Sequence, residues 1–150
     1  MKRFLSFCLA ILLLASAFSV TAVAAPENRL VSTSVEYLED GSYFITEVYE
    51  SAIQPRTGQI GSKTSTYYGE NGSKIFSVTV NGTFSYVYCS SVGATGAEAI
   101  VNIFNNNASY VSKSAYTREA SAYAVGTVSY NGINITRTVV LTCDKYGNLS

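Results

Sequence analysis

The sequence predicts an all-β protein, specifically an antiparallel two-sheet sandwich of the immunoglobulin-like kind with seven or eight strands. Val, Ile, Thr, Tyr and Phe recur with a period of two through most of the chain, and helix formers are scarce. Gly, Asn and Asp separate these runs at the spacing of short hairpins. A closed barrel of the same strand number is the alternative that this pattern leaves open.

The first 25 residues have the features of an export signal. A short basic start, residues 1–3, precedes an apolar run over residues 4–20, and residues 21–25 end in a small-x-small pattern. We therefore expect a signal helix that is cleaved after Ala24 or Ala25. The remaining residues, 26–150, number about 125, which is enough for a single domain with a continuous core.

Two other interpretations of this segment are less favoured. Its most apolar part, residues 7–14, is shorter than the roughly 20 residues that a membrane-spanning helix needs. A lipoprotein signal needs a cysteine just after the apolar run, whereas Cys8 lies inside it. The mature protein is therefore expected outside the cell without a membrane span, either free or associated with the cell surface.

Three Asp-Gly or Asn-Gly pairs divide the chain into hairpins, because both positions of such a pair accept the positive φ of a type I′ turn. The predicted hairpins, each given as strand, turn and strand, are 33–39, Asp40-Gly41 and 42–53; 63–70, Asn71-Gly72 and 73–88; and 119–130, Asn131-Gly132 and 133–143. Two shorter strands, 97–104 and 110–116, are expected between the second and third hairpins.

The strand over residues 73–88 has the clearest alternation in the chain. Its apolar parity consists of Phe76, Val78, Val80, Phe84, Tyr86 and Tyr88, and we assign the first four to the core. Gly82 interrupts this parity, so a bend there could carry the strand from one sheet to the other, which favours a sandwich. Residues 54–61 are expected to form an irregular crossover between the sheets.

Composition excludes several classes of function. The chain contains no histidine, so Ser/His/Asp triads, Cys/His dyads and histidine-ligated zinc are excluded. Removal of Lys2 and Arg3 leaves eight basic against ten acidic residues, a net charge of about −2, with no basic cluster. Nucleic acid is therefore not an expected partner, and no metal or cofactor is expected.

Cys89 and Cys143 are the cysteines of the mature chain. Each lies at the end of a predicted strand, and export favours oxidation, so we predict a disulfide between them. Such a bond closes a loop of about 54 residues and would stabilise the fold by roughly 4 kcal/mol. Two buried free cysteines are the alternative, since some Gram-positive bacteria export few disulfides.

All twelve tyrosines lie in the mature chain, and tryptophan is absent. A phenol combines apolar area with a hydrogen-bonding tip, which suits a ligand contact. Tyr67 and Tyr68 are adjacent in a predicted strand and must point to opposite faces, so one of them is expected to be exposed. We take this pair as the candidate ligand contacts.

Carboxylates suggest two further hypotheses. Glu36, Glu39, Glu47 and Glu50 cluster in the first hairpin and could form a glycosidase-type pair. Residues 144–148 include Asp144 and Asn148 but lack the spacing of an EF-hand loop, so a tail turn is expected there. No residue is assigned a catalytic or metal-ligating role.

Several blocks of the sequence together resemble a known group of proteins. The blocks are residues 61–68, Asn71-Gly72, residues 76–80, residues 82–86 with Cys89, residues 137–144 and residues 147–150. In these blocks the chain is similar to small secreted proteins of unknown function from Gram-positive, gut-type bacteria. The resemblance implies an exported β-sandwich and brings no activity or site residues.

These observations favour a non-enzymatic secreted module that binds an extracellular protein, a glycan or another cell-surface component through a sheet face or a loop end. The first alternative is a secreted antagonist of neighbouring cells, bacteriocin-like or toxin-like, which shares the size and the export signal. The second alternative is a small hydrolase that uses the carboxylates of the first hairpin.

Overall fold

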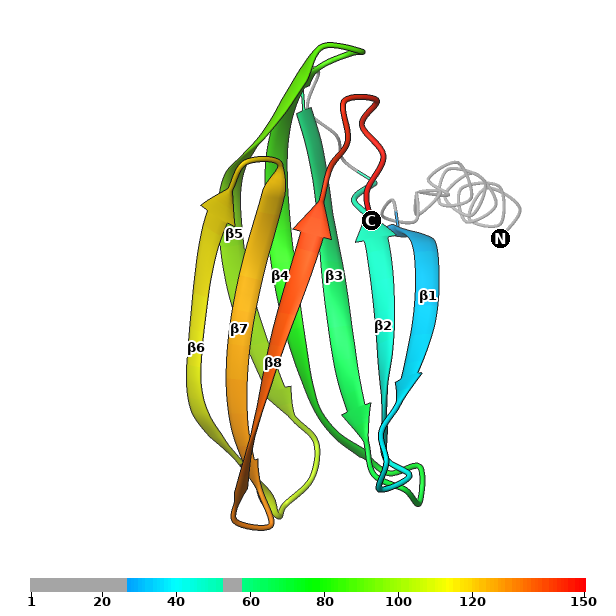
Figure 1. The fold of residues 1–150 in the computed structure, drawn as a ribbon, viewed down its shortest axis with the longest axis vertical. Coiled ribbons are helices and arrows are strands. Elements are labelled where there is room, and N and C mark those ends of the chain that lie inside the picture. Colours follow the sequence, from blue (N-terminus) through cyan, green and yellow to red (C-terminus); the bar gives the residue numbers. More distant parts are fainter. Residues whose placement is uncertain (1–26, 53–57) are drawn as a thin grey trace, which may run out of the picture.

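The computed structural model describes residues 27–52 and 58–150, so the predicted signal peptide lies outside the described residues. Eight strands form in this part of the chain (Figure 1). Their bounds are β1 (Arg29–Tyr37), β2 (Tyr43–Glu50), β3 (Gly58–Tyr68), β4 (Lys74–Val87), β5 (Ser91–Ile103), β6 (Ala108–Arg118), β7 (Ser121–Tyr130) and β8 (Ile133–Thr142).

The strands form one sheet in the order β1-β2-β3-β4-β5 and a second in the order β6-β7-β8, with every pair antiparallel. The predicted all-β sandwich with antiparallel sheets is confirmed. The connectivity differs in one respect from immunoglobulin domains, which use Greek-key crossovers. Here each strand lies beside its predecessor, because short hairpins place successive strands next to one another.

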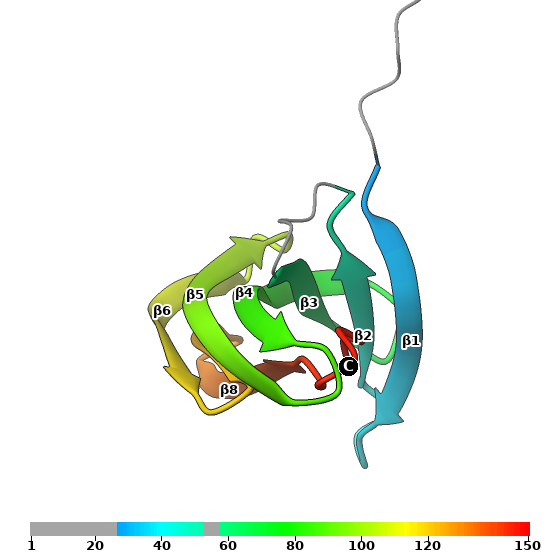
Figure 2. The same ribbon diagram turned by 90° about the horizontal axis from the view of Figure 1, so that it is seen from above.

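The chain changes sheets between β5 and β6, which lie side by side at one corner of the sandwich. The corner is held by a hydrogen bond from the Ala94 amide to the Glu119 carbonyl, 2.7 Å long. On the other side β8 packs against β3 and β4. Figure 2 shows that β1 and β2 extend beyond the three-stranded sheet, so the sandwich is open along this side.

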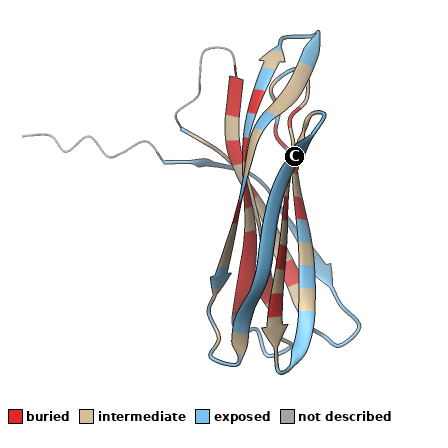
Figure 3. Ribbon diagram, turned by 90° about the vertical axis from the view of Figure 1, so that its left-hand side faces the viewer, coloured by how far each residue is buried: buried red, intermediate tan, exposed pale blue. Residues whose placement is uncertain are grey.

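The core lies between the facing surfaces of the two sheets, where the buried residues are gathered (Figure 3). Phe76, Val78, Val80 and Phe84 are all buried, which confirms their predicted place in the core. Opposite them β7 presents Ala122, Ala124, Gly126 and Val128. A Cβ on Gly126 would lie 2.7 Å from a methyl group of Val78, so glycine allows the sheets to approach at this point.

Two expectations about the first sheet are wrong. β4 does not pass between sheets at Gly82, because it pairs with β3 on one side and β5 on the other along its length. The irregularity lies one step later, between Thr83 and Phe84. Of the crossover predicted over residues 54–61, residues 54–57 lie outside the described residues. Residues 58–61 begin β3, where Gly61 pairs with Gly82.

The three predicted turns adopt two geometries. Asn131 and Gly132 both have positive φ, +50° and +80°, which confirms the two-residue type I′ turn. In the other two, only Gly41 and Gly72 have positive φ, and each loop has three residues, closed by hydrogen bonds between Leu38 and Ser42 and between Gly69 and Ser73. Asp40 and Asn71 bond through their side chains to the amide two residues on, which favours this longer loop.

Candidate ligand-binding surfaces

Tyr67 and Tyr68 point to opposite faces of the five-stranded sheet, as predicted. Tyr67 faces the core, is 5% exposed, and has its ring 5.0 Å from that of Phe44 and 5.3 Å from that of Phe76. Tyr68 lies on the outer face, is partly exposed, and stacks on Tyr43 with ring centroids 5.1 Å apart. Tyr68 is therefore the member of the pair that can contact a partner on the sheet face.

Tyr68 belongs to a row of three tyrosines that crosses the outer face of β1, β2 and β3. Tyr37 pairs with Tyr43, and Tyr43 pairs with Tyr68, in the register of the sheet. The rings of Tyr37 and Tyr43 are 5.6 Å apart, and Tyr37, at the sheet edge, is 76% exposed. We call Tyr37, Tyr43 and Tyr68 the tyrosine row.

Tyr37 and Tyr43 are not among the ligand contacts predicted from the sequence. The signal was present, because both residues flank the first turn at positions that a hairpin register pairs. Only the pairing of β2 with β3 adds Tyr68 to them. The tyrosine row therefore depends on the register of β1 with β2 and on the register of β2 with β3.

The outer face beside the tyrosine row is rich in hydroxyl and amide side chains. Thr64 of β3 and Thr79 of β4 are hydrogen bonded across the strands at 2.8 Å. Further along, Asn81 donates to Glu98 at 3.1 Å. The face therefore combines aromatic area with hydroxyl, amide and carboxylate groups.

Tyr67 also lines a depression at the turn end of the sandwich, of about 350 Å³. The other lining residues are Leu38, Asp40, Tyr130, Asn131, Ile133 and Ile135. Tyr130 lies edge-on to Tyr67, with ring centroids 6.4 Å apart. The buried tyrosine therefore contributes mainly to packing, with one edge at this depression.

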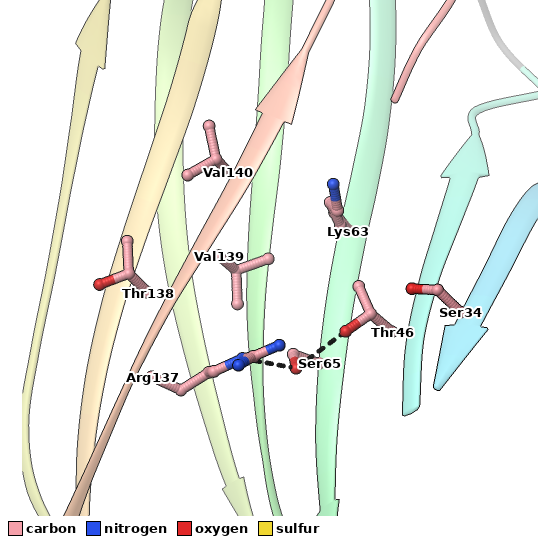
Figure 4. Close-up of a pocket in the computed structure, with 8 residues that line it drawn as sticks. All are labelled: Ser34, Thr46, Lys63, Ser65, Arg137, Thr138, Val139 and Val140. Atoms are coloured by element: carbon pink, nitrogen blue, oxygen red, sulfur yellow. Dashed lines mark hydrogen bonds between the residues drawn. The ribbon is translucent and has the colours of Figure 1, made fainter. Parts of the chain in front are cut away.

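A second feature is a cleft of about 290 Å³ between the two sheets on their open side, shown in Figure 4. We call it the inter-sheet cleft, and it is lined by Ser34, Thr46, Lys63, Ser65, Arg137, Thr138, Val139 and Val140. The five-stranded sheet contributes Lys63 and the hydroxyl groups of Ser34, Thr46 and Ser65, and β8 contributes Arg137 and the hydroxyl group of Thr138. Two cationic side chains thus face the same open space.

Arg137 is held in a fixed orientation. Its Nε donates to Ser65 Oγ at 2.9 Å, its Nη1 lies 2.8 Å from Glu36 Oε2, and its guanidinium carbon is 4.2 Å from the centre of the Phe44 ring. Ser65 also accepts a hydrogen bond from Thr46 at 3.0 Å. These contacts engage Nε, Nη1 and one face of the guanidinium.

Lys63 lies on the inner face of β3, paired with Val80 of β4 and Val48 of β2. Partial burial, together with repulsion from the Arg137 charge, lowers the pKa of the Lys63 ammonium below its usual value. Within residues 27–52 and 58–150, no carboxylate lies within ion-pair distance of this ammonium. Lys63 is thus a half-buried cation beside a second cation.

Both cysteines of the predicted disulfide are free, so that bond is not present in this structure. Cys89 is exposed in the turn between β4 and β5, where its φ is +61° and its amide donates to the Lys145 carbonyl. Cys143 instead points into the core, where burial raises the pKa of its thiol to about 11. The backbone contact near Lys145 brings the two segments together while the side chains occupy different environments.

The carboxylates of the first hairpin do not converge on one site. Glu36 pairs with Arg137 on the inner face, while Glu47 lies on the outer-facing parity of β2. Glu50 is bound to Arg29 and Gln59, and these hydrogen bonds hold the pKa of Glu50 below its usual value. A general acid needs a raised pKa, so this arrangement does not support the hydrolase alternative.

The loop at residues 144–148 is closed by its own side chains. Asp144 accepts hydrogen bonds from the amides of Tyr146 and Asn148 and from the Asn148 side chain. These bonds lower the pKa of Asp144. The tail turn that the sequence predicted accounts for this loop, and no group of metal-binding side chains is found among the described residues.

Comparison of the chain with protein-family models, with curated proteins and with solved structures finds no match. The resemblance to small secreted proteins therefore stays a prediction. Within the described residues there is no helix of the length and hydropathy needed to cross a membrane.

Proposed function

We propose that this chain is an exported, non-enzymatic module that binds a cell-surface glycan through the outer face of the five-stranded sheet. The observation that carries the proposal is the tyrosine row, three aromatic side chains in register across β1, β2 and β3. Export itself rests on the signal features of residues 1–25.

The chemistry of the face favours a glycan over other surface polymers. Sugar rings present apolar C–H faces that pack on aromatic rings, and their hydroxyl groups need hydrogen-bonding partners. Tyr37 supplies an open ring, and neutral groups such as those of Thr64 and Thr79 lie on the same face. An exposed aromatic group of this kind on a small domain marks an interaction surface.

The exposed apolar residues of β1 extend this surface. Leu30, Val31, Val35 and Tyr37 are each at least 40% exposed, and β1 is exposed along its whole length. An edge strand that carries so much apolar area favours contact with a partner. The proposed contact surface therefore runs from the tyrosine row to the outer edge of β1.

The proposal is tested by co-sedimentation of the mature chain with insoluble peptidoglycan, chitin and cellulose. We expect at least one of these polymers to retain the protein, and Tyr37→Ala to weaken retention by about tenfold, which is the loss of roughly one aromatic contact. Tyr37 is exposed, so the variant should keep the wild-type melting temperature.

Tyr116→Ala is the matched control, because Tyr116 is also exposed and also stacks on a neighbouring tyrosine, Tyr123, but on the other sheet. It should bind as the wild type does. Equal losses in Tyr37→Ala and Tyr116→Ala would mean that the tyrosine row is not the site. Absence of retention by every polymer, or capture of a protein partner instead, would overturn the glycan assignment.

A further inference from the structure

We propose that the inter-sheet cleft is a binding site for a small carboxylate ligand, held between Lys63 and Arg137. The ligand class is an organic acid of about monosaccharide size, or a single acidic unit of a larger molecule. The cleft is open to solvent and lies on the inner side of β3, opposite the outer face that carries Tyr68. The proposal therefore stands independently of the glycan surface.

The charges around the cleft are unbalanced. Lys63 and Arg137 both face it, whereas Glu36 is the carboxylate that pairs with Arg137 at its margin, with 56% of its side chain exposed. Glu36 belongs to β1, and the inward-facing carboxylate of β2, Glu50, is already bound to Arg29 and Gln59. One positive charge is thus left without a partner among these groups.

Half-buried like charges repel more strongly than exposed ones, because less water screens them. The pKa of Lys63 is lowered by its burial and, to a smaller extent, by the charge of Arg137. An anion bound between the two cations would remove the repulsion and restore the preference of Lys63 for its protonated form. Anion binding would therefore offset a repulsion between Lys63 and Arg137 that is present in the free protein.

Arg137 is oriented for such a ligand before the ligand arrives. Its Nε and Nη1 atoms are occupied by Ser65 and Glu36, and the Phe44 ring covers one face of the guanidinium. Within residues 27–52 and 58–150 no hydrogen bond or ion pair engages Nη2, so its donors remain for a ligand. A side chain that is already fixed loses little entropy on binding. Donors of this kind make short, charge-assisted hydrogen bonds with carboxylates.

The size and charge of the cleft favour a monoanion. Its volume of about 290 Å³ is at the lower limit for small-molecule sites. One unbalanced positive charge matches one carboxylate, whereas a phosphate group would bring more negative charge beside Glu36. The hydroxyl groups of Ser34 and Thr138, which also line the cleft, can contact the polar remainder of the ligand.

The test is a titration of the mature chain with sodium glucuronate at constant ionic strength, followed by NMR of the Lys63 side chain. We expect saturable binding in the millimolar range and a rise in the pKa of the Lys63 ammonium on saturation. Methyl glucoside, which has the same ring without the charge, should produce neither change. Lack of saturation with glucuronate would overturn the proposal.

Three variants test which residues of the cleft contribute to glucuronate binding. Lys63→Met replaces the ammonium group with an uncharged side chain of similar shape. It should weaken glucuronate binding by about tenfold, which corresponds to the loss of one charge-assisted contact. Glu36→Gln removes the competing carboxylate and should strengthen binding several-fold. Lys113→Met, on exposed β6, is the matched control and should have no effect.

Opposite effects of Lys63→Met and Glu36→Gln are not expected of residues that serve folding alone. Equal affinity for glucuronate in these two variants and the wild type would overturn the proposal. If Lys63→Met does not fold, the affinity of Glu36→Gln alone tests the proposal, and an unchanged value would overturn it. Tighter binding of inorganic phosphate than of glucuronate would overturn the carboxylate assignment. Loss of glycan retention in Tyr37→Ala, with glucuronate binding unchanged, would separate the two surfaces.

Discussion

Cys89 and Cys143 lie in contrasting surroundings. Cys89 is exposed in a turn, whereas Cys143 is 1% exposed and its thiol contacts the Asp144 carbonyl at 3.4 Å. Burial disfavours the thiolate and raises the pKa of Cys143 to about 11. Since the thiolate is the reacting form, the two residues should differ in reactivity.

We predict that iodoacetamide at pH 8 labels Cys89 in the native mature chain and leaves Cys143 unlabelled. Denaturant should expose Cys143, so a second label should then be added without any reductant. Intact-mass measurement followed by peptide mapping would count and locate the labels. A chain that accepts no label in denaturant until it is reduced would instead contain the disulfide.

At the scale of the elements, turn chemistry decides where the strands begin and end. The turn between β7 and β8 needs positive φ at both Asn131 and Gly132, and glycine reaches φ = +80° without the steric cost that a Cβ brings. The same turn fixes the register in which Tyr130 pairs with Ile133. The inward-facing residues of β8, including Arg137, depend on that register.

Gly132→Ala should therefore lower the free energy of unfolding by about 1 kcal/mol. Gly93→Ala is the matched control, because a Cβ at either position would meet nothing within 4 Å, and only Gly132 has positive φ. The control should be neutral or slightly stabilising. Urea unfolding measures the free energy of unfolding of both variants. Equal values would show that a Cβ at position 132 does not strain the turn.

At the scale of the whole molecule, the end of the chain closes the sandwich. Leu149 is buried against Gly61 of β3, where a Cβ would lie 2.3 Å from the Leu149 Cδ1 atom. Ser150 exchanges two hydrogen bonds of 3.0 Å with Thr142, at the end of β8. The tail thus joins the free edge of β8 to the first sheet above the inter-sheet cleft.

Leu149→Ala should lower the free energy of unfolding by about 2–3 kcal/mol, because it leaves a cavity between the sheets. Ile133→Ala, at the start of β8 and 68% exposed, should change stability by less than about 0.5 kcal/mol. Thermal or urea unfolding gives both values. A neutral Leu149→Ala would mean that the tail does not contribute to closure.

Much of the fold follows from local patterns that the sequence carries openly. The alternation at Phe76, Val78 and Val80 predicted a buried face, and Asn131-Gly132 predicted a type I′ turn, because both are decided by neighbouring residues. The start of β3 at Gly58 was missed, since glycines and polar residues there gave no alternation. That segment is a strand because β4 pairs with it.

The candidate sites were less accessible to sequence reasoning. Tyr68 was identified as one of a pair, but the tyrosine row depends on the alignment of three strands. The inter-sheet cleft was not predicted, because Lys63 and Arg137 are far apart in the chain and meet only when β8 packs across β3. No spacing of residues in the sequence predicts that Lys63 and Arg137 lie close together.

The sequence by itself determined most of the strands, the places of the three turns and the core parity of β4, because these depend on steric preferences and apolar periodicity over a few residues. Tertiary structure alone decided that the two cysteines stay apart, that the sheets follow chain order, and that Lys63 and Arg137 share a cleft. These outcomes depend on how the two sheets pack, which brings together residues that no local pattern relates.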